Sequence, residues 1–367
     1  MPRVCCADGR LMIRAVIHSQ ALRANLRRLR EVAPGSRIMA VVKANAYGHG
    51  LVPVALALAD ADAFAVARIE EAVALRAAGV RRPVVLLEGV FTGDQLEEAA
   101  RLELDLVVHQ PDQLQLLAEL RSTHRFVVWL KIDTGMNRLG FRVEQFAAAL
   151  HRLQSLSECV REIRVLTHLA RADEPADPMN SLQVQRFSTL VQGLGLPLSI
   201  ANSAALLANP QVHADWVRPG LALYGVSPLP GHTAEQLGLV PAMTLETRVI
   251  SLRQVPAGET VGYGATWRAA RDSQVAIIAA GYGDGLPWGL PVGTRLLVGA
   301  QALPLVGRVS MDMLAVDVTD SQQPVSVGTP VQLWGPQLPV EQMAASAGTL
   351  PYELLCGISQ RVPLILG

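Results

Sequence analysis

Eight short apolar runs alternate with stretches of helical periodicity through the first two thirds of the chain. The runs cover residues 38–43, 63–67, 84–87, 105–109, 126–132, 164–168, 198–201 and 215–223, and clear helical stretches cover 20–32, 70–78, 94–102 and 112–120. Short apolar runs bounded by helices are typical of parallel strands that are buried on both faces. Eight strand–helix units over about 225 residues are what a (β/α)8 barrel requires, so we expect a TIM barrel.

A doubly wound open sheet is the main alternative to the barrel. That fold usually places a glycine-rich phosphate turn directly after its first strand. Here the first run ends at Lys43 and continues as Ala-Asn-Ala-Tyr-Gly-His-Gly to Gly50. The absence of the glycine-rich turn favours the barrel.

The sequence pattern changes near residues 238–241. Beyond this point the strand-like segments are 247–255, 274–280, 295–298, 303–318 and 331–334, and only 340–347 has a clear helical pattern. Turns rich in Gly, Pro and Asp separate these segments, which is typical of β structure. We therefore expect a flexible tail over residues 1–11, an α/β barrel over 12–240 and a mostly β C-terminal domain over 241–367.

Charge and cysteine content exclude several classes of function. The 32 basic and 32 acidic residues balance, which argues against a nucleic-acid-binding protein. No apolar run approaches the roughly 18 residues that cross a membrane, and the N-terminus has no signal-peptide pattern, so we expect a cytoplasmic protein without a membrane partner. The four cysteines, Cys5, Cys6, Cys159 and Cys356, match no zinc or redox spacing and are expected to be free thiols. We expect no metal.

Polar residues gather where the barrel strands are expected to end, which is where barrel enzymes carry their chemistry. They are Lys43, Arg68, His109, Lys131, Asp133, Arg138, His168, Asn202, Ser203 and Arg218. Burial at the end of an apolar strand disfavours a charged amine, and a neutral lysine amine can form a Schiff base. Lys43 is therefore the candidate for covalent attachment of a carbonyl cofactor.

The loops after strands seven and eight are the usual phosphate site of such barrels. Ser203 and the backbone amides of Gly220 and Leu221 are the candidate phosphate ligands. Together with Lys43 and Arg218, they suggest that the cofactor is pyridoxal 5′-phosphate.

Seven segments and one late tyrosine resemble the alanine racemases. They are residues 40–50, 131–140, 167–168, 201–205, 218–220, 261–264 and 307–313, together with Tyr352. The resemblance runs from about residue 14 to the C-terminus, and its motifs occur in order. It implies a pyridoxal-phosphate-dependent isomerase that interconverts L-alanine and D-alanine.

The resemblance implies two acid/base groups on opposite faces of the substrate Cα. Lys43 would carry the cofactor as an aldimine and then serve one face, and Tyr263 would serve the other. Racemisation needs such a pair, because the proton removed from one face returns from the opposite one. His168 and Arg218 would support Tyr263. Arg218 would also face the pyridine nitrogen, where a related family of decarboxylases has an acidic residue.

Further roles follow from the same resemblance. The cofactor-binding residues would be Lys43, Tyr47, His168, Asn202, Ser203, Arg218, Gly220, Leu221 and Tyr352. The substrate-binding residues would be Arg138, Met311 through its amide, and Asp312, and the substrate entrance would be lined by Asp173, Tyr282 and Arg308. Lys131 aligns with a lysine that is N6-carboxylated in many relatives. Since Tyr263, Met311 and Asp312 come from the partner subunit in this family, a head-to-tail homodimer is implied.

Two positions near the expected site depart from the family pattern. Ser199 replaces a usual histidine two residues before the Ala-Asn-Ser segment, so the contacts that support Arg218 differ here. Trp288 occupies a position at the substrate entrance where arginine is common.

Alternative functions remain at this stage. A serine-directed or broad-specificity racemase is one, although Tyr352 favours alanine. A metal-dependent hydrolase on the same barrel would use His109, His168, Lys131 and Asp133, but the expected His-X-His pair is absent. A non-catalytic pyridoxal-phosphate carrier would lack the second domain and Tyr263. The expected role is supply of D-alanine as a peptidoglycan precursor, with catabolism of D-alanine as the alternative direction.

Overall fold

A computed structural model describes residues 12–367. Eight parallel strands form a closed barrel in the order β5-β4-β3-β2-β10-β9-β8-β6, with β6 pairing back to β5. The strands are β2 (Arg37–Val41), β3 (Ala63–Val66), β4 (Val84–Leu86), β5 (Asp105–Val108), β6 (Phe126–Asp133), β8 (Val160–Leu166), β9 (Leu198–Asn202) and β10 (Trp216–Arg218). The expected TIM barrel is confirmed.

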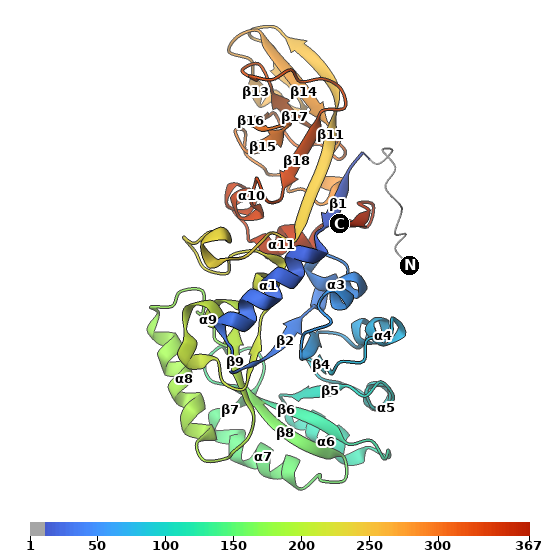
Figure 1. Ribbon diagram of the computed structural model, residues 1–367, viewed down its shortest axis with the longest axis vertical. Helices are drawn as coiled ribbons and strands as arrows, with labels where there is room; N and C mark the ends of the chain where they lie inside the picture. The colour runs from blue at the N-terminus through green and yellow to red at the C-terminus, as the bar shows by residue number, and fades with distance from the viewer. Residues whose placement is uncertain (1–11) are drawn as a thin grey trace.

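Helices surround the barrel and connect its strands (Figure 1). They are α1 (Ser19–Val32), α2 (Lys43–Tyr47), α3 (Leu51–Ala57), α4 (Ile69–Ala77), α5 (Gly93–Arg101), α6 (Pro111–Glu119), α7 (Phe146–Gln154), α8 (Pro178–Val191) and α9 (Ser203–Ala208). In α1 the buried positions Leu22, Leu26 and Leu29 repeat at helical spacing and pack against the core. Helix α5 begins where the Thr92 hydroxyl accepts a hydrogen bond from the Gln95 amide.

The barrel interior is packed toward the N-terminal ends of its strands. The Arg164 guanidinium lies 5.2 Å from the ring centroid of Trp129 and 5.0 Å from that of Trp216. Its Nη1 also lies 3.9 Å from a carboxylate oxygen of Asp105, which is buried. With this end filled, the polar residues at the opposite, C-terminal ends are the ones available for chemistry.

A second sheet of eight strands follows the order β14-β17-β16-β15-β18-β11-β1-β19, and β11 also pairs with β14. Its strands are β1 (Arg14–Ile17), β11 (Met243–Val255), β14 (Ser273–Ile278), β15 (Arg295–Val298), β16 (Gln301–Val306), β17 (Leu314–Asp317), β18 (Pro330–Trp334) and β19 (Leu364–Leu366). The expected β-rich C-terminal domain is confirmed, and it extends away from the barrel along β11 (Figure 1).

Strand β1 belongs to the second sheet, although it lies within the range 12–240 expected for the barrel. It pairs antiparallel with β11 and parallel with β19. The expectation of a tail concerned residues 1–11, which lie outside the described residues, as do Cys5 and Cys6. Of the described cysteines, Cys159 is buried, Cys356 is exposed, and both are free.

Four segments differ from the sequence-based expectation. The expected strand 303–318 is two strands, β16 and β17, separated by a loop. Helix α10 (Val340–Ala347) occurs as expected, but α11 (Pro351–Cys356) was not anticipated. Strand β8 begins at Val160, earlier than expected, because polar Arg161 and Glu162 interrupt its apolar pattern. The run 215–223 is a strand only to Arg218, since Pro219-Gly220 ends it and a 3-10 turn, η3 (Leu221–Tyr224), follows.

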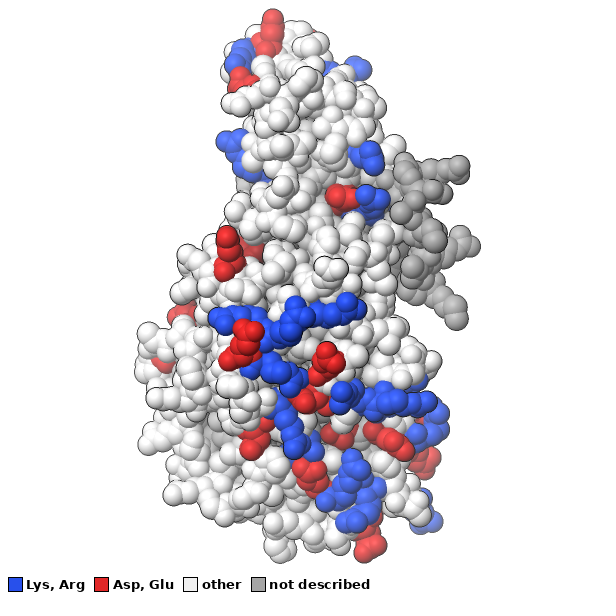
Figure 2. All heavy atoms as spheres, in the orientation of Figure 1, with Lys and Arg blue, Asp and Glu red and all other residues white. Residues whose placement is uncertain are grey.

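Several short elements complete the described chain. They are the strands β7 (Phe141–Arg142), β12 (Thr260–Val261) and β13 (Trp267–Arg268), and the 3-10 turns η1 (Val143–Gln145), η2 (Pro210–Val212), η4 (Glu235–Leu237), η5 (Tyr263–Ala265) and η6 (Tyr282–Asp284). None of the helices within residues 12–367 has the length and hydropathy needed to cross a membrane. On the face shown in Figure 2, acidic and basic side chains intermingle over the barrel and are sparse over the second domain.

Candidate active site

Five cationic or basic side chains gather at the C-terminal end of the barrel. Burial, and then the nearby charges of Arg218, Arg138 and Lys43, lower the pKa of Lys131 to about 8. Burial and the same neighbours hold the pKa of His168 well below its usual value, so its imidazole is neutral. The structure thus brings together the residues at the ends of β2, β6, β8 and β10. Such a cluster attracts anionic ligands.

Arg218 is buried without a carboxylate partner among the described residues. Its guanidinium donates to the Thr167 carbonyl oxygen at 2.6 Å and to the Ile200 carbonyl oxygen at 3.2 Å, and Nη2 lies 3.5 Å from Nδ1 of His168. Nη1 donates to the Ser199 hydroxyl at 2.5 Å, and this hydroxyl donates to the Trp216 carbonyl oxygen. Ser199 therefore supports Arg218 directly. Burial lowers the Arg218 pKa to about 10, so the group stays charged at neutral pH.

The loops after β9 and β10 meet at Ser203. Its hydroxyl accepts hydrogen bonds from the amides of Gly220 at 2.8 Å and Ala222 at 3.2 Å. Two backbone amides of the loop after β10 thus converge on Ser203, and the Leu221 amide lies between them in the sequence, at the start of η3. The side-chain oxygen of Asn202, the residue before Ser203, accepts a hydrogen bond from the Ala205 amide and caps α9.

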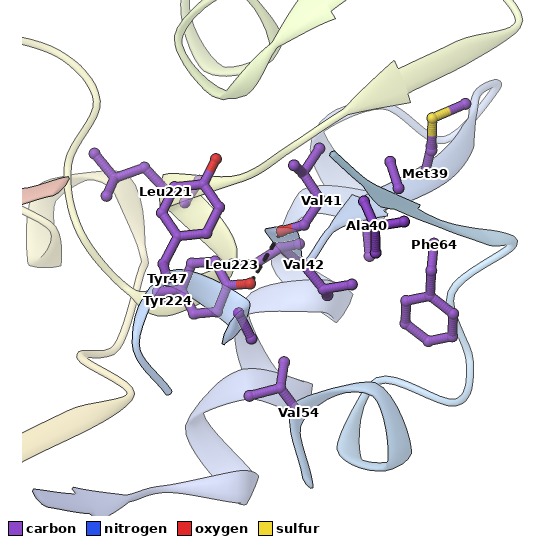
Figure 3. Close-up of a cluster of buried hydrophobic side chains, with 14 of the residues drawn as sticks. Met39, Ala40, Val41, Val42, Tyr47, Val54, Phe64, Leu221, Leu223 and Tyr224 are labelled. Carbon is purple, nitrogen blue, oxygen red and sulfur yellow. Dashed lines mark hydrogen bonds between the residues drawn. The ribbon is translucent and has the colours of Figure 1, made fainter. Parts of the chain in front are cut away.

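Tyr47 lies beside this amide cluster. A Cβ on Gly220 would lie 2.4 Å from the Tyr47 hydroxyl oxygen, so only glycine fits at this position. The Tyr47 ring packs 4.8 Å from that of Tyr224, whose hydroxyl donates to the Val41 carbonyl oxygen (Figure 3). Burial raises the pKa of Tyr47 above its usual value. Sequence reasoning did not identify Tyr224, because it lies in an apolar run and resembles a core residue.

The segment after Lys43 has an unusual backbone. Ala44, Asn45, Ala46 and Tyr47 all have positive φ, between 51° and 54°, which is one turn of left-handed helix. Glu71, at the start of α4, accepts hydrogen bonds from the amides of Ala44, Ala67 and Arg68. This carboxylate ties the loop after β2 to the loop after β3.

The second domain of the same chain contributes Tyr352 to this region. Helix α11 packs against α2, and a Cβ on Gly48 would lie 2.0 Å from the Leu355 carbonyl oxygen. The Tyr352 ring lies 5.9 Å from that of Tyr47. Burial, and then the charge of Asp173, raises the pKa of Tyr352. Tyr352 therefore lies beside Tyr47, and Asp173 is close enough for its charge to act on Tyr352.

Arg138 lies in a loop that Asp133 organises. One carboxylate oxygen of Asp133 accepts from the amides of Gly135 at 2.9 Å and Asn137 at 3.0 Å. Asp133 is thus occupied by its own loop, and His109 contacts the Glu88 carbonyl oxygen and Gln113. Among residues 12–367, no group of three or more His, Cys, Asp or Glu side chains is arranged to hold a metal ion.

Tyr263, Met311 and Asp312 all belong to the second domain, whereas Lys43 belongs to the barrel. Tyr263 begins η5, next to β13, which lies at the end of the second domain far from the barrel (Figure 1). The Tyr263 side chain is 74% exposed and that of Met311 is 53% exposed. Tyr282 is also exposed, and the Arg308 guanidinium lies 5.4 Å from the Trp288 ring centroid.

The fold and the site together define a class. The chain forms a (β/α)8 barrel with a lysine at the end of a strand. A buried arginine has no carboxylate partner among the described residues, and backbone amides converge on Ser203. These features fit an enzyme that binds an anionic pyridoxal cofactor. Two family descriptions match: "Alanine racemase, N-terminal domain" over residues 17–228 and "Alanine racemase, C-terminal domain" over residues 242–366. The chain belongs to the alanine racemase family of pyridoxal-phosphate-dependent isomerases, as the sequence motifs indicated.

Individual relatives agree with this assignment. The alanine racemase of Nitrosococcus oceani is 50% identical over 95% of this chain and 98% of its own length. The alanine racemase of Shewanella amazonensis is 47% identical over 96% and 98%. The biosynthetic alanine racemase of Pseudomonas aeruginosa superposes with a TM-score of 0.93 at 44% identity over 97% and 99% of the two chains. The alanine racemase of Bartonella henselae, solved with covalently bound pyridoxal phosphate, superposes with a TM-score of 0.88 at 31% identity over 97% and 100%.

Proposed function

We propose that this enzyme interconverts L-alanine and D-alanine and supplies D-alanine as a peptidoglycan precursor. The observation that carries the proposal is the cationic cluster of Lys43, Lys131, Arg138 and Arg218, which adjoins the amides after β10. An amino-acid carboxylate and a cofactor phosphate are the anions that such a cluster accommodates. The names of the full-length relatives support alanine as the substrate.

The residues present fit pyridoxal phosphate. Lys43 is its attachment point, and Ser203 with the amides of Gly220 and Leu221 holds the phosphate, with Tyr47 and Tyr352 beside it. Asn202 and His168 complete the pocket. When bound, the cofactor supplies an electron sink that acidifies the substrate Cα proton. Arg218 would be the residue next to the pyridine nitrogen; because it keeps its own proton, it would make that sink weaker and favour return of the proton to Cα over side reactions.

Proton exchange at Cα uses two groups. The Lys43 amine removes or returns the proton on one face, and the Tyr263 hydroxyl does so on the other. Met311 presents its backbone amide to the substrate, and Asp312 lies next to it on the substrate side of the same loop. Tyr352 limits the room for the substrate side chain, and Asp173, Tyr282 and Arg308 line the entrance.

The active form is a head-to-tail homodimer with shared sites. The exposure of Tyr263 in the second domain supports this arrangement, because a catalytic tyrosine must reach a barrel site. Each site then combines Lys43 of one chain with the second domain of its partner.

Lys131 is N6-carboxylated in the active enzyme. Its lowered pKa of about 8 leaves a fraction of neutral amine, which is the form that reacts with carbon dioxide. The product is an anion, and an anion there holds Arg138 in place to bind the substrate carboxylate. The same change removes one of the buried cations from the cluster. An electron-density map showing a bare Lys131 amine in the active enzyme would contradict this assignment.

Exchange of the α-proton in heavy water tests the proposal. The holoenzyme is incubated separately with L-alanine, D-alanine and, as a control, each enantiomer of serine. We expect exchange and racemisation with both alanine enantiomers and much slower reaction with serine. Tyr263→Phe should lower racemisation about 100-fold or more while affecting exchange unequally for the two enantiomers. Full racemase activity in this variant would contradict the two-base assignment, and equal rates with serine would indicate a broad-specificity racemase.

A further inference from the structure

The loop between β16 and β17 carries Met311 and Asp312 and has its own backbone supports. The Met311 carbonyl oxygen accepts a hydrogen bond from the Gly283 amide at 2.9 Å, and the Ser310 carbonyl oxygen accepts from the Tyr282 amide at 3.0 Å. The Ser310 amide and hydroxyl both donate to the Met313 carbonyl oxygen. The loop is therefore fixed along one side by the segment 281–285.

An ionic bridge adds a side-chain link between this loop and the same segment. Arg361 donates from Nε to Asp284 at 2.7 Å and from Nη2 to Asp312 at 2.7 Å. The second carboxylate oxygen of Asp284 accepts from the Gly281 amide at 2.9 Å. The Asp284 side chain is only 4% exposed, whereas that of Asp312 is 59% exposed. Arg361 thus links a buried anchor to an exposed loop residue.

Close backbone packing leaves this assembly little freedom. A Cβ on Gly281 would lie 2.3 Å from the carbonyl oxygens of both Ser310 and Met311. A Cβ on Gly283 would lie 3.0 Å from the Arg361 guanidinium and from the Met311 carbonyl oxygen. Both glycines are needed for the two segments to approach so closely.

We propose that Arg361 and Asp284 are positioning residues for substrate binding in the partner's site. The bridge holds the 310–313 loop so that the Met311 amide keeps a fixed direction. It also pairs the negative charge of Asp312, which would otherwise repel the substrate carboxylate that the neighbouring amide binds. The inference rests on the proposed function, because it assumes that this loop meets the substrate.

The test compares Arg361→Gln and Arg361→Lys with a matched control. Arg271→Gln removes an arginine that pairs with exposed Asp320, elsewhere in the second domain. Hydrogen–deuterium exchange of segment 308–313 is measured in each holoenzyme, together with KM and kcat for both alanine enantiomers. Cofactor affinity and Tm report whether the fold and the pyridoxal site are intact.

We expect Arg361→Gln to raise amide exchange in segment 308–313 and KM for both enantiomers about tenfold, with a smaller effect on kcat. Arg361→Lys should bring the amide exchange and the KM part of the way back to the wild-type values, since lysine keeps the charge but not the fork of two donors. Arg271→Gln should leave both the amide exchange and the KM at the wild-type values.

Two outcomes overturn the inference: exchange in Arg361→Gln equal to that of the control, or raised exchange with an unchanged KM. A wild-type enzyme that fails to racemise alanine would instead refute the proposed function, and the exchange data would still show whether the bridge holds the loop.

Discussion

At the residue scale, Arg218 shows how a cation can be kept inside a barrel without a counter-carboxylate. Carbonyl oxygens of Thr167 and Ile200 and the hydroxyl of Ser199 supply its acceptors. All three are uncharged, so no carboxylate among the described residues compensates the positive charge. The sequence indicated Arg218 through its position at a strand end, but the hydroxyl contact of Ser199 required the three-dimensional register of β9 against β10.

His49 is a buried titratable residue in the loop that carries Lys43. Its Nδ1 lies 2.8 Å from the Tyr47 carbonyl oxygen, which fixes the tautomer with Nδ1 protonated. Its Nε2 is buried and has no hydrogen-bond partner among the described residues. Burial lowers the pKa of His49 to about 4, so the folded protein holds it neutral.

His49 should make folding sensitive to acid. Between pH 6.5 and pH 4 the unfolded chain protonates His49 and the folded chain does not, so stability falls as the pH falls through this window. Replacement by asparagine removes this term. On acidification from pH 7 to 4.5, wild type should lose about 2–3 kcal/mol more of its free energy of unfolding than His49→Asn does. Urea unfolding of both proteins at the two pH values measures the difference, and parallel losses would contradict the expectation.

At the element scale, the left-handed turn after β2 is the least ordinary part of the backbone. Each non-glycine residue in this conformation costs about 1–2 kcal/mol. The turn persists because Glu71 holds its first amide and the Leu355 carbonyl oxygen packs against Gly48 at its end. The turn places Lys43 and Tyr47 on the same short loop, and its backbone conformation sets the direction in which each side chain leaves the loop.

Glycine at Ala44 should relieve part of this cost. The Ala44 side chain is exposed, so its methyl group contributes little packing, and its amide is retained. We expect Ala44→Gly to raise the free energy of unfolding by about 0.5–1 kcal/mol. Ala148→Gly, at an exposed position inside the right-handed helix α7, is the control and should lower it by about 1 kcal/mol. Urea unfolding measures both, and destabilisation by Ala44→Gly would contradict the prediction.

Periodicity predicted most elements, because burial on both faces of parallel strands leaves continuous apolar runs. It failed where local sequence and tertiary pairing disagree. Arg14–Ile17 is too short to be recognised, and its partners lie more than 200 residues away along the chain. Barrel enzymes carry their chemistry where the strands end, and this expectation identified Lys43, Lys131, His168 and Arg218 from the sequence. Tyr263 was identified only by family resemblance. The bridge through Arg361 and Asp284 was missed, because it joins residues 77 positions apart.

At the scale of the whole molecule, the two domains separate the two proposed acid/base groups. Lys43 lies in the barrel, and Tyr263 lies in the second domain. A single chain therefore presents half of each proposed site. This division makes the shared-site dimer testable without a structure of the assembly.

Complementation between inactive chains tests the shared site. Lys43→Ala and Tyr263→Phe should each abolish most activity alone. Random exchange of subunits in an equal mixture puts half of the dimers in the mixed form, and each mixed dimer has one site with both groups intact. The mixture should therefore regain about a quarter of wild-type racemase activity. The control is each variant taken alone through the same subunit-exchange procedure. A mixture that stays inactive would show that both groups act within one chain.

Strand β1 has a consequence for the order of synthesis. It lies between β11 and β19, so one of the first described segments to leave the ribosome needs one partner that follows the barrel and another at the C-terminal end of the chain. At ~5–20 residues per second, β19 is synthesised about 20–70 seconds after β1. Until β11 has been synthesised, β1 has neither of its partner strands. A separately expressed second domain would lack this strand, and β19 would have no neighbour to pair with.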